Sequence, residues 1–410
     1  MVVDSGARGQ ALGMKLAHEG EAIFISPGNP GNEDFAVSTN LIPSDISGQL
    51  AFARQNKVDF TIVGGEDLLA AGIVDNFNQA KLAIFGPTRA QARIEADREF
   101  AKEIGHRHSV PMGAFGSFMG KTTAIEYAEN HGWPVFVKDN GLAGGKGASK
   151  CETPKEVEAE IARLGGKIII EDYVGGLEAS HHAFCDGKSQ LSIPFLVRDH
   201  KQIGDGNRGP MTGGMGVVGP LPEYSSRDSE EFGETFAAPV VQELGFKGML
   251  FSGLKGNKGH EKLLEWNARP GDPETQVFLA LMKGKLLPVL QACVEGSLDK
   301  IEPPDWWLGQ SAVSLVLAAQ GYPEKPQTGA IIEGIEEAEK TKNIQILYAA
   351  TKKQGSQLVT NGGRVLNILA TAESLSAALT QAYSAAEHIT FNGQPPTFRR
   401  DIGHSVVSGL

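Results

Sequence analysis

The sequence predicts a multidomain protein of mixed α/β and α+β class. Its 410 residues exceed what one ordinary hydrophobic core holds, so two or three domains are expected. In the N-terminal region, short apolar runs alternate with helical patterns, which is typical of a parallel sheet covered by helices. Toward the other end, a proline-rich stretch at 301–307 precedes several apolar runs of strand length. We read that last part as a separate α+β domain of about 100 residues.

In the N-terminal region, each expected strand runs into a segment with glycine, proline or both. Ligands bind beyond the carboxyl ends of the strands in such sheets, so these segments are candidate ligand contacts. The expected strands cover 2–3, 22–26, 60–63 and 82–85, and the expected helices cover 8–19 and 45–56.

The middle region is expected to hold further helices and strands, with one long glycine- and proline-rich loop at 204–222. Its expected helices cover 88–107, 120–131, 153–164, 226–244, 274–282 and 285–296. Its expected strands cover 135–138, 149–152, 167–171, two runs within 178–198, 247–254 and 261–269. In the C-terminal region, strands are expected over 311–319, 345–351, 356–359 and 364–370, and a helix over 373–388.

Composition and charge exclude several classes of protein. Hydrophobic residues make up 41% and charged residues 21%, which is typical of a globular chain. The net charge of −11 argues against a nucleic-acid partner, which usually requires a basic face. No apolar run is long enough for a membrane span, and the first ten residues lack a signal-peptide pattern. The three cysteines lie far apart, so we expect a cytoplasmic protein without disulfides.

A glycine-rich segment, KDNGLAGGKGAS at 138–149, follows an expected strand. It has four glycines between 141 and 147, with Lys138 before them and Lys146 among them. Exposed backbone N–H groups beside two cations suit the phosphates of a nucleotide, although the spacing is not that of a Walker A motif. The same residues also fit a glycine-rich β-hairpin with incidental lysines.

The segment EKLLEWNARPGDPET at 261–275 carries three functional groups on one face of a strand. Because alternate strand residues share a face, Glu265, Asn267 and Arg269 lie in a row. Carboxylate and amide oxygens are ligands for Mg²⁺, and a guanidinium neutralises a phosphoryl group. The alternative is an exposed face of an edge strand.

Two further segments are candidate ligand contacts. In IIIEDYVGGLEAS at 168–180, backbone at 172–174 could hold an adenine edge and Glu178 the ribose hydroxyls. In GDGNRGPMTGGMG at 204–216, main-chain donors could wrap a small polar substrate. An interdomain connection and a disordered surface loop are the respective alternatives.

Taken together and in this order, the motifs resemble the phosphoribosylamine–glycine ligases (glycinamide ribonucleotide synthetases), a family of ATP-grasp enzymes. The resemblance covers nearly the whole chain. It rests on GLAGGKG at 141–147, DHKQIGDGNRGPMTGGMG at 199–216, RPGDPETQ at 269–276, AAQGYP at 318–323 and TNGGRV at 360–365.

The resemblance implies an N-terminal Rossmann-like domain at 1–97 and a two-lobed ATP-grasp domain at 98–305. The small lobe spans about 110–175 and carries the lid, and a C-terminal domain follows at 306–410. The implied reaction joins glycine to 5-phosphoribosylamine, with glycyl phosphate as the intermediate. It consumes ATP and uses Mg²⁺ or Mn²⁺. The expected protein is a monomer or weak homodimer in the cytoplasm, with neither a nucleic-acid nor a membrane partner.

The resemblance also implies a role for individual residues. Glu265 and Asn267 are expected to bind the metal, and Arg269 and Lys146 to act on the transferred phosphoryl group. The ATP contacts implied are Arg98, Lys138, Gly144, Gly145, Lys146, Glu171, Asp172, Val174 and Glu178. The substrate contacts implied are Gly6, Glu66, Asp205, Thr212, Gly213, Gly214, Asp272, Lys352 and Arg364.

The chain departs from the family pattern at several of these places. The first loop reads DSGARGQA at 4–11 where the family reads like GSGGREHA, and Met211 replaces an asparagine. Arg98 stands where a lysine is usual, and the stretch before Lys167 is about ten residues short. Two alternatives therefore stay open: an ATP-grasp ligase for another carboxylate and amine, and a non-catalytic nucleotide-binding paralogue.

Overall fold

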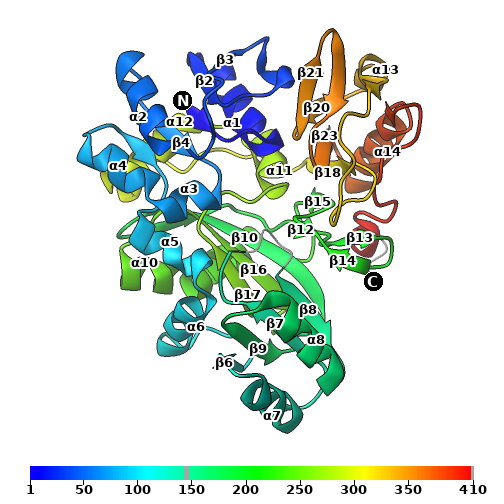
Figure 1. Ribbon diagram of the computed structural model, residues 1–410. Coiled ribbons are helices and arrows are strands. Elements are labelled where there is room, and N and C mark those ends of the chain that lie inside the picture. Colours follow the sequence, from blue (N-terminus) through cyan, green and yellow to red (C-terminus); the bar gives the residue numbers. More distant parts are fainter. Residues whose placement is uncertain (143–146, 408–410) are drawn as a thin grey trace.

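A computed structural model describes residues 1–142 and 147–407. Figure 1 shows the N-terminal elements, in blue, beside the C-terminal strands and helices in orange and red. The middle of the chain, in cyan and green, lies below both groups. Within the described ranges, no helix is both long enough and apolar enough to cross a membrane.

The N-terminal region forms a five-stranded parallel sheet, as the alternating pattern predicts. Its order is β3-β2-β1-β4-β5, with strands Ala36–Ser38, Ile23–Ser26, Val2–Val3, Thr61–Val63 and Ile84–Phe85. Its helices are α1 (Ala7–His18), α2 (Ile46–Gln55), α3 (Glu66–Ala71) and α4 (Ile73–Gln79). Strand β3 and helices α3 and α4 were not among the expected elements. Glu66 begins α3 just after the carboxyl end of β4, where the parallel topology places ligands.

The single helix expected over 88–107 is in fact two helices, α5 (Arg89–Ala96) and α6 (Arg98–Arg107). Asp97 breaks the run because it takes an extended conformation, and its side chain accepts a hydrogen bond from the N–H of Phe100. An aspartate in this position caps the second helix. The break separates Glu95 from Arg98, and both side chains line the pocket described below.

The middle of the chain builds two antiparallel sheets. The smaller has the order β6-β9-β7-β8, with strands Phe115–Phe118, Ile168–Asp172, Val135–Asp139 and Ala148–Cys151. Helices α7 (Lys121–His131) and α8 (Pro154–Leu164) pack on it around Ala128, Val137 and Ile170. The larger has the order β11-β10-β16-β17, with strands Gln190–Ser192, Leu177–Asp186, Lys247–Gly256 and Lys262–Asn267.

The helix expected over 226–244 forms with one irregularity. Helices α9 (Ser226–Phe232) and α10 (Ala238–Leu244) are joined by a π-helical turn at Gly233–Ala237. Helices α11 (Glu274–Leu281) and α12 (Leu287–Glu295) follow the larger sheet, close to their expected bounds.

The loop expected over 204–222 is wrong in part, because strands lie within it. Strands β13 (Gln202–Gly204) and β14 (Arg208–Met211) form a small hairpin, and β15 (Gly216–Gly219) is fully buried. Val217 and Val218 explain the last strand, since two adjacent apolar residues suit a strand covered on both faces. The glycine content concealed this pattern at the level of sequence.

The C-terminal region contributes most of a five-stranded sheet of order β12-β15-β18-β23-β20. Strands β12 (Arg198–Asp199) and β15 enter it from the preceding region, so this sheet joins chain from both sides of residue 306. Its other strands are β18 (Ser311–Ala318), β23 (Arg364–Ala372) and β20 (Ile344–Tyr348). The remaining elements are β19 (Ile332–Glu333), β21 (Thr351–Gln354), β22 (Gln357–Thr360), β24 (Thr390–Phe391), α13 (Ile335–Glu339), α14 (Leu375–Ala386) and α15 (His404–Val407). The domain limits at 97 and 305 remain predictions.

Candidate active site

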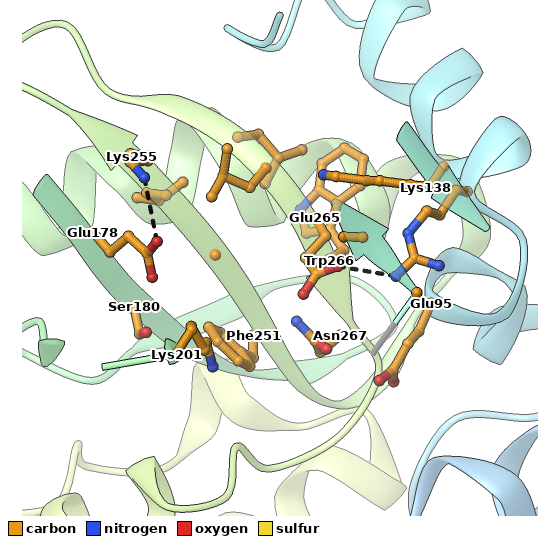
Figure 2. A pocket seen from close by; sticks show the side chains of 18 of the residues that line it. Glu95, Lys138, Glu178, Ser180, Lys201, Phe251, Lys255, Glu265, Trp266 and Asn267 are labelled. Carbon is orange, nitrogen blue, oxygen red and sulfur yellow. Dashed lines mark hydrogen bonds and ion pairs between the residues drawn. The ribbon is translucent and has the colours of Figure 1, made fainter. Parts of the chain in front are cut away.

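One pocket of about 380 Å³ collects most of the residues that the sequence singled out. Its walls come from the N-terminal region, both middle sheets and the C-terminal region. Figure 2 shows Glu178 and Lys255 at one end, and Glu265, Asn267 and Glu95 at the other. The predicted residues that line it are Glu66, Arg98, Lys138, Glu171, Asp172, Val174, Glu178, Thr212, Gly213, Glu265, Asn267, Arg269, Asp272 and Arg364.

The candidate metal ligands lie on β17. Glu265 and Asn267 alternate with the buried Trp266, so both face the pocket as the strand period predicts (Figure 2). Burial raises the pKa of Glu265, but Arg98, Lys138 and Lys201 outweigh it and hold that pKa below its usual range. The carboxylate is therefore ionised at neutral pH. No cluster of three or more His, Cys, Asp or Glu side chains suited to a metal occurs in the described part of the chain.

Beside these ligands, two lysines enclose one buried glutamate. Lys102 of α6 lies 2.6 Å from Oε2 of Glu171, and Lys138 of β7 contacts its other oxygen. Burial alone would raise the pKa of Glu171, but the two ammonium groups lower it to about 2. The group carries one net positive charge, which favours an anion such as a phosphate. We call Lys102, Lys138, Glu171 and Glu265 the nucleotide side of the pocket.

Arg98 ties the nucleotide side to the start of the glycine-rich segment. Its Nη1 donates to the carbonyl oxygens of Asp139 and Gly141, at 2.9 and 2.6 Å, and its Nη2 lies 3.3 Å from Oε2 of Glu265. These contacts are divided between two nitrogens of a planar guanidinium, a geometry that the single nitrogen of a lysine does not have. Arg98 thus holds backbone as well as offering charge.

At the other end, the side chain of Glu178 on β10 lies 3.4 Å from that of Lys255, its partner on the adjacent strand β16 (Figure 2). Val174, Phe136 and Leu254 add apolar lining, which suits the face of a planar ring. Asp172 lines the pocket, but its carboxylate is engaged by His131 at 2.5 Å and by the backbone N–H of Ala114 at 2.9 Å.

Arg269 is held by two glutamates from the N-terminal part of the chain. Its Nε donates to Glu66 at 3.0 Å, and its Nη2 lies 3.2 Å from Glu95. Burial acts to raise the pKa of both carboxyl groups, but the final pKa shifts have opposite directions. For Glu66, Arg269 and Arg8 outweigh burial and the pKa is lowered. For Glu95, burial wins over Arg269 and raises the pKa to about 7.

Arg364 joins the C-terminal region to the pocket. Its guanidinium donates to the carbonyl oxygens of Gly213 and Asp272, at 2.7 and 2.6 Å, and to Oδ2 of Asp272 at 2.8 Å. The backbone N–H of Gly213 in turn donates to the hydroxyl of Tyr322 at 3.2 Å. We call Glu66, Thr212, Gly213, Asp272 and Arg364 the amine side of the pocket.

Lys201 lies between two buried carboxylates, at 2.5 Å from Asp199 and 3.5 Å from Glu274. Burial opposes its charge, but both carboxylates raise the pKa of Lys201 above its usual range. Gly214 packs against this cluster with φ of +113°, and a Cβ there would lie 2.6 Å from Oδ2 of Asp199. That position therefore requires glycine.

Three family models match the chain in order. They are phosphoribosylglycinamide synthetase N domain over residues 1–95, its ATP-grasp (A) domain over 96–275 and its C domain over 312–405. The chain belongs to the phosphoribosylglycinamide synthetase family. Membership confirms the resemblance and the predicted fold of a Rossmann-like domain, an ATP-grasp unit and a C-terminal α+β domain.

Full-length relatives support the assignment to the synthetase family. A protein of Mesorhizobium japonicum named phosphoribosylamine–glycine ligase is 36% identical over 100% of this chain and 98% of its own length. A crystal structure of phosphoribosylamine–glycine ligase from Thermotoga maritima has a TM-score of 0.80 at 28% identity, covering 98% of each chain. The biotin carboxylase domain of Hydrogenobacter thermophilus 2-oxoglutarate carboxylase, solved with MgADP, has a TM-score of 0.72 at 15% identity and shares the fold.

Several residues implied by the synthetase resemblance do not line the pocket. Gly214 donates to the hydroxyl of Thr212, which lines the pocket. Gly6 donates to Asp4, which in turn accepts a hydrogen bond from the lining residue Arg8. Asp205 is exposed and accepts a hydrogen bond from the N–H of Arg400. Lys352 is exposed on β21, and neither strand of its hairpin contributes a residue to the pocket lining. Asp205 and Lys352 thus lie outside the lining of this pocket, and their roles as substrate contacts stay predictions. Gly144, Gly145 and Lys146 lie outside the described residues.

Sequence reasoning missed six charged residues that line the pocket: Arg8, Glu95, Lys102, Lys201, Lys255 and Glu274. Lys102 and Glu95 lie on helices whose pattern suggests only a buried stripe and a polar face. Lys201 had a usable signal, because it follows Asp199 and His200 directly before the glycine-rich stretch. The importance of these three residues comes from contacts with Glu171, Arg269 and Glu274, which are distant in sequence.

Proposed function

We propose that this chain joins glycine to 5-phosphoribosylamine, forming glycinamide ribonucleotide, ADP and phosphate from ATP. The observation that carries the proposal is that all three synthetase models match in order along the chain. One pocket also draws its walls from each of those three parts. The name of the full-length Mesorhizobium relative points to the same reaction.

The chemistry explains why such a pocket needs charge more than a nucleophile. A carboxylate is a poor electrophile, so ATP first converts glycine to glycyl phosphate, whose carbonyl carbon an amine then attacks. The first step transfers a charged phosphoryl group and the second releases phosphate, and both require close alignment of the reactants. Arg98, Lys102, Lys138, Lys201 and Arg269 line the pocket and supply the positive charge. We propose that Arg269 neutralises the acyl phosphate, and the contacts of its guanidinium with Glu66 and Glu95 support a fixed position for that charge.

The donor set of β17 fits a divalent cation, which we propose to be Mg²⁺ or Mn²⁺. Glu265 offers an ionised carboxylate and Asn267 an amide oxygen, and Mg²⁺ is usually held by one or two such groups with phosphates and water. When bound, the cation would neutralise charge on the transferred phosphoryl group. Arg98 pairs with Glu265 in this structure and keeps its carboxylate turned to the pocket.

A coupled assay tests the proposed reaction. Purified protein receives Mg-ATP, glycine and phosphoribosylamine made in situ from ribose 5-phosphate and ammonia, and ADP release is followed together with product mass. Release that requires both co-substrates is the expected result. ADP release that is stimulated only by other acids or amines would instead support a ligase that joins a different carboxylate and amine. Met211, which lines the pocket and departs from the family pattern, is the reason to test this alternative. ATP binding without turnover would contradict both and favour a non-catalytic paralogue.

The cytoplasmic location and the monomer or weak homodimer stay predictions.

A further inference from the structure

The second half-reaction releases a proton that the pocket must accept. When the amine nitrogen of the second substrate bonds to the carbonyl carbon of glycyl phosphate, that nitrogen becomes positively charged. It must lose a proton before the bond between carbon and phosphate oxygen can break to leave a stable amide. A general base for this transfer needs an ionisable group that lines the pocket and is not committed to a lysine or a metal.

The carboxylates that line the described part of the pocket can be compared on this point. Glu171 is enclosed by two lysines, Glu265 belongs to the proposed metal site, and Asp272 is bound by Arg364 and Gln276. Glu178 pairs with Lys255, Glu274 with Lys201, and Asp172 with His131. Glu66 accepts from Arg269 and its pKa is lowered, which makes it a weak base.

Glu95 shares Arg269 with Glu66, but it differs from Glu66 in its position and in its second partner, which is a backbone N–H. It lies near the end of α5, with its side chain 10% exposed and lining the cavity. One oxygen accepts the N–H of Ala268 at 2.8 Å, and the other lies 3.2 Å from Nη2 of Arg269. Figure 2 shows it at the same end of the pocket as Asn267. Glu95 thus lies where the acyl phosphate held by Arg269 would meet an amine arriving from the side of Glu66.

We propose that Glu95 accepts the proton released by the attacking amine, an inference that rests on the proposed function. The nitrogen–carbon bond forms, the carbon–oxygen bond to phosphate breaks, phosphate leaves with the electron pair, and one N–H proton moves to the carboxylate of Glu95. The proton passes to water after the product leaves. No oxidant, reductant or further reactant is needed.

The electrostatic surroundings suit this role. Burial raises the pKa of Glu95 to about 7, Arg269 opposes the rise, and the carboxylates of Glu66 and Glu265 add to it. A base must be ionised to accept a proton, so the second half-reaction slows as the pH falls below about 7. The first half-reaction does not use this proton and should lack that dependence.

Hydroxylamine separates the two halves of the reaction, because it attacks acyl phosphates without help from a protein base. The full-length protein is given Mg-ATP and glycine with either hydroxylamine or phosphoribosylamine, and glycine hydroxamate and glycinamide ribonucleotide are measured. In Glu95→Gln, the ratio of ribonucleotide to hydroxamate should fall about 10²-fold below wild type. Glu95→Asp keeps a carboxylate, so its ratio of ribonucleotide to hydroxamate should be at least about tenfold higher than that of Glu95→Gln.

Arg269→Lys is the control that shows what to expect if Glu95 serves only to position Arg269. It should lower both products together and leave their ratio within about threefold of wild type, because Arg269 serves the phosphoryl group in both steps. An unchanged ratio in Glu95→Gln, with both products reduced, would overturn the inference and leave Glu95 as a support for Arg269. Wild-type protein that forms hydroxamate but no ribonucleotide would instead overturn the proposed amine substrate, and the inference with it.

Discussion

The two sides of the pocket are assembled in different ways. The nucleotide side, Lys102, Lys138, Glu171 and Glu265, comes from α6, β7, β9 and β17, all within the part that the ATP-grasp model matches. The amine side is assembled from distant segments, with Glu66 at the start of α3 and Arg364 at the start of β23. Thr212 and Gly213 follow the β13–β14 hairpin.

Long-range contacts also join the N-terminal and C-terminal regions, which contribute Glu66 and Arg364 to the amine side. Gln10 donates to Gly31 at 2.9 Å and accepts the N–H of Tyr348 at 2.6 Å, and Asn29 donates to the carbonyl of Tyr348 at 2.8 Å. The two bonds to Tyr348 join helix α1 and the segment after β2 to β20. Substitutions on the nucleotide side should therefore impair ATP use, whereas those in interdomain contacts should impair the amine substrate alone.

Glu265→Gln should have the largest effect, because it removes charge at the proposed metal ligand on the nucleotide side. A metal contributes several kcal/mol to stabilising the transferred phosphoryl group, so turnover should fall at least about 10²-fold. Circular dichroism should be unchanged, since the side chain lines a cavity and not the core. Activity within a few-fold of wild type would contradict the metal assignment.

Lys102→Met tests the nucleotide side through its buried pair. Lys102 and Glu171 are 5% and 4% exposed, and breaking a buried pair costs about 3–5 kcal/mol, so the melting temperature should fall clearly. The pKa of Glu171 is depressed to about 2, so its contribution to stability is present above about pH 4.5 and lost as the pH falls toward 2. In the variant that loss should begin at higher pH, as thermal melts between pH 3 and pH 7 would show.

The matched control is Lys121→Met, which breaks the pair with Glu158 between α7 and α8. Those side chains are 52% and 51% exposed, so the change in stability should be under about 1 kcal/mol. Equal destabilisation by the two substitutions would mean that burial does not distinguish the pairs.

The same contrast explains how much could be predicted from the sequence. The nucleotide side follows from local pattern, since the strand period alone places Glu265 and Asn267 on one face of β17. The parallel N-terminal sheet follows from alternating strands and helices in the same way. Lys102 could not be assigned, because only the tertiary fold brings α6 against Glu171 of β9.

The predicted secondary structure is wrong where a helix cap or a glycine-rich stretch overrides the hydrophobic pattern of the sequence. Asp97 ends one helix and begins the next, which a continuous helical pattern over 88–107 conceals. The glycines around Val217 and Val218 suggested a loop, although the two valines form a buried strand. Asp205, expected at the substrate by motif position, accepts a hydrogen bond from the backbone N–H of Arg400, and its role at the substrate stays a prediction.

Arg364→Lys should act on the amine side alone. A lysine cannot reproduce the three hydrogen bonds to Gly213 and Asp272, and losing one charge-assisted bond should raise KM for phosphoribosylamine about tenfold. KM for ATP should change by less than about twofold, because the bonds lost are not on the nucleotide side. Steady-state kinetics with each substrate varied in turn measures both. An equal rise in the two KM values would break the distinction between the two sides.

Arg399→Lys should have the smallest effect, because Arg399 does not line the pocket and acts only through the β13–β14 hairpin. The buried guanidinium of Arg399 binds Asp401 and also donates to the carbonyl of Gln202 and to Asn207 at 3.2 and 2.8 Å, which anchors the β13–β14 hairpin. Loosening that hairpin should raise KM for phosphoribosylamine about threefold through Thr212 and Gly213, with kcat nearly unchanged. Arg400→Lys is the matched control, since the Arg400 side chain stacks on Phe398 at the surface and should leave KM unaltered. If Arg399→Lys raised KM for ATP instead, the hairpin would belong to the nucleotide side, and the long-range assembly of the amine side would need another anchor.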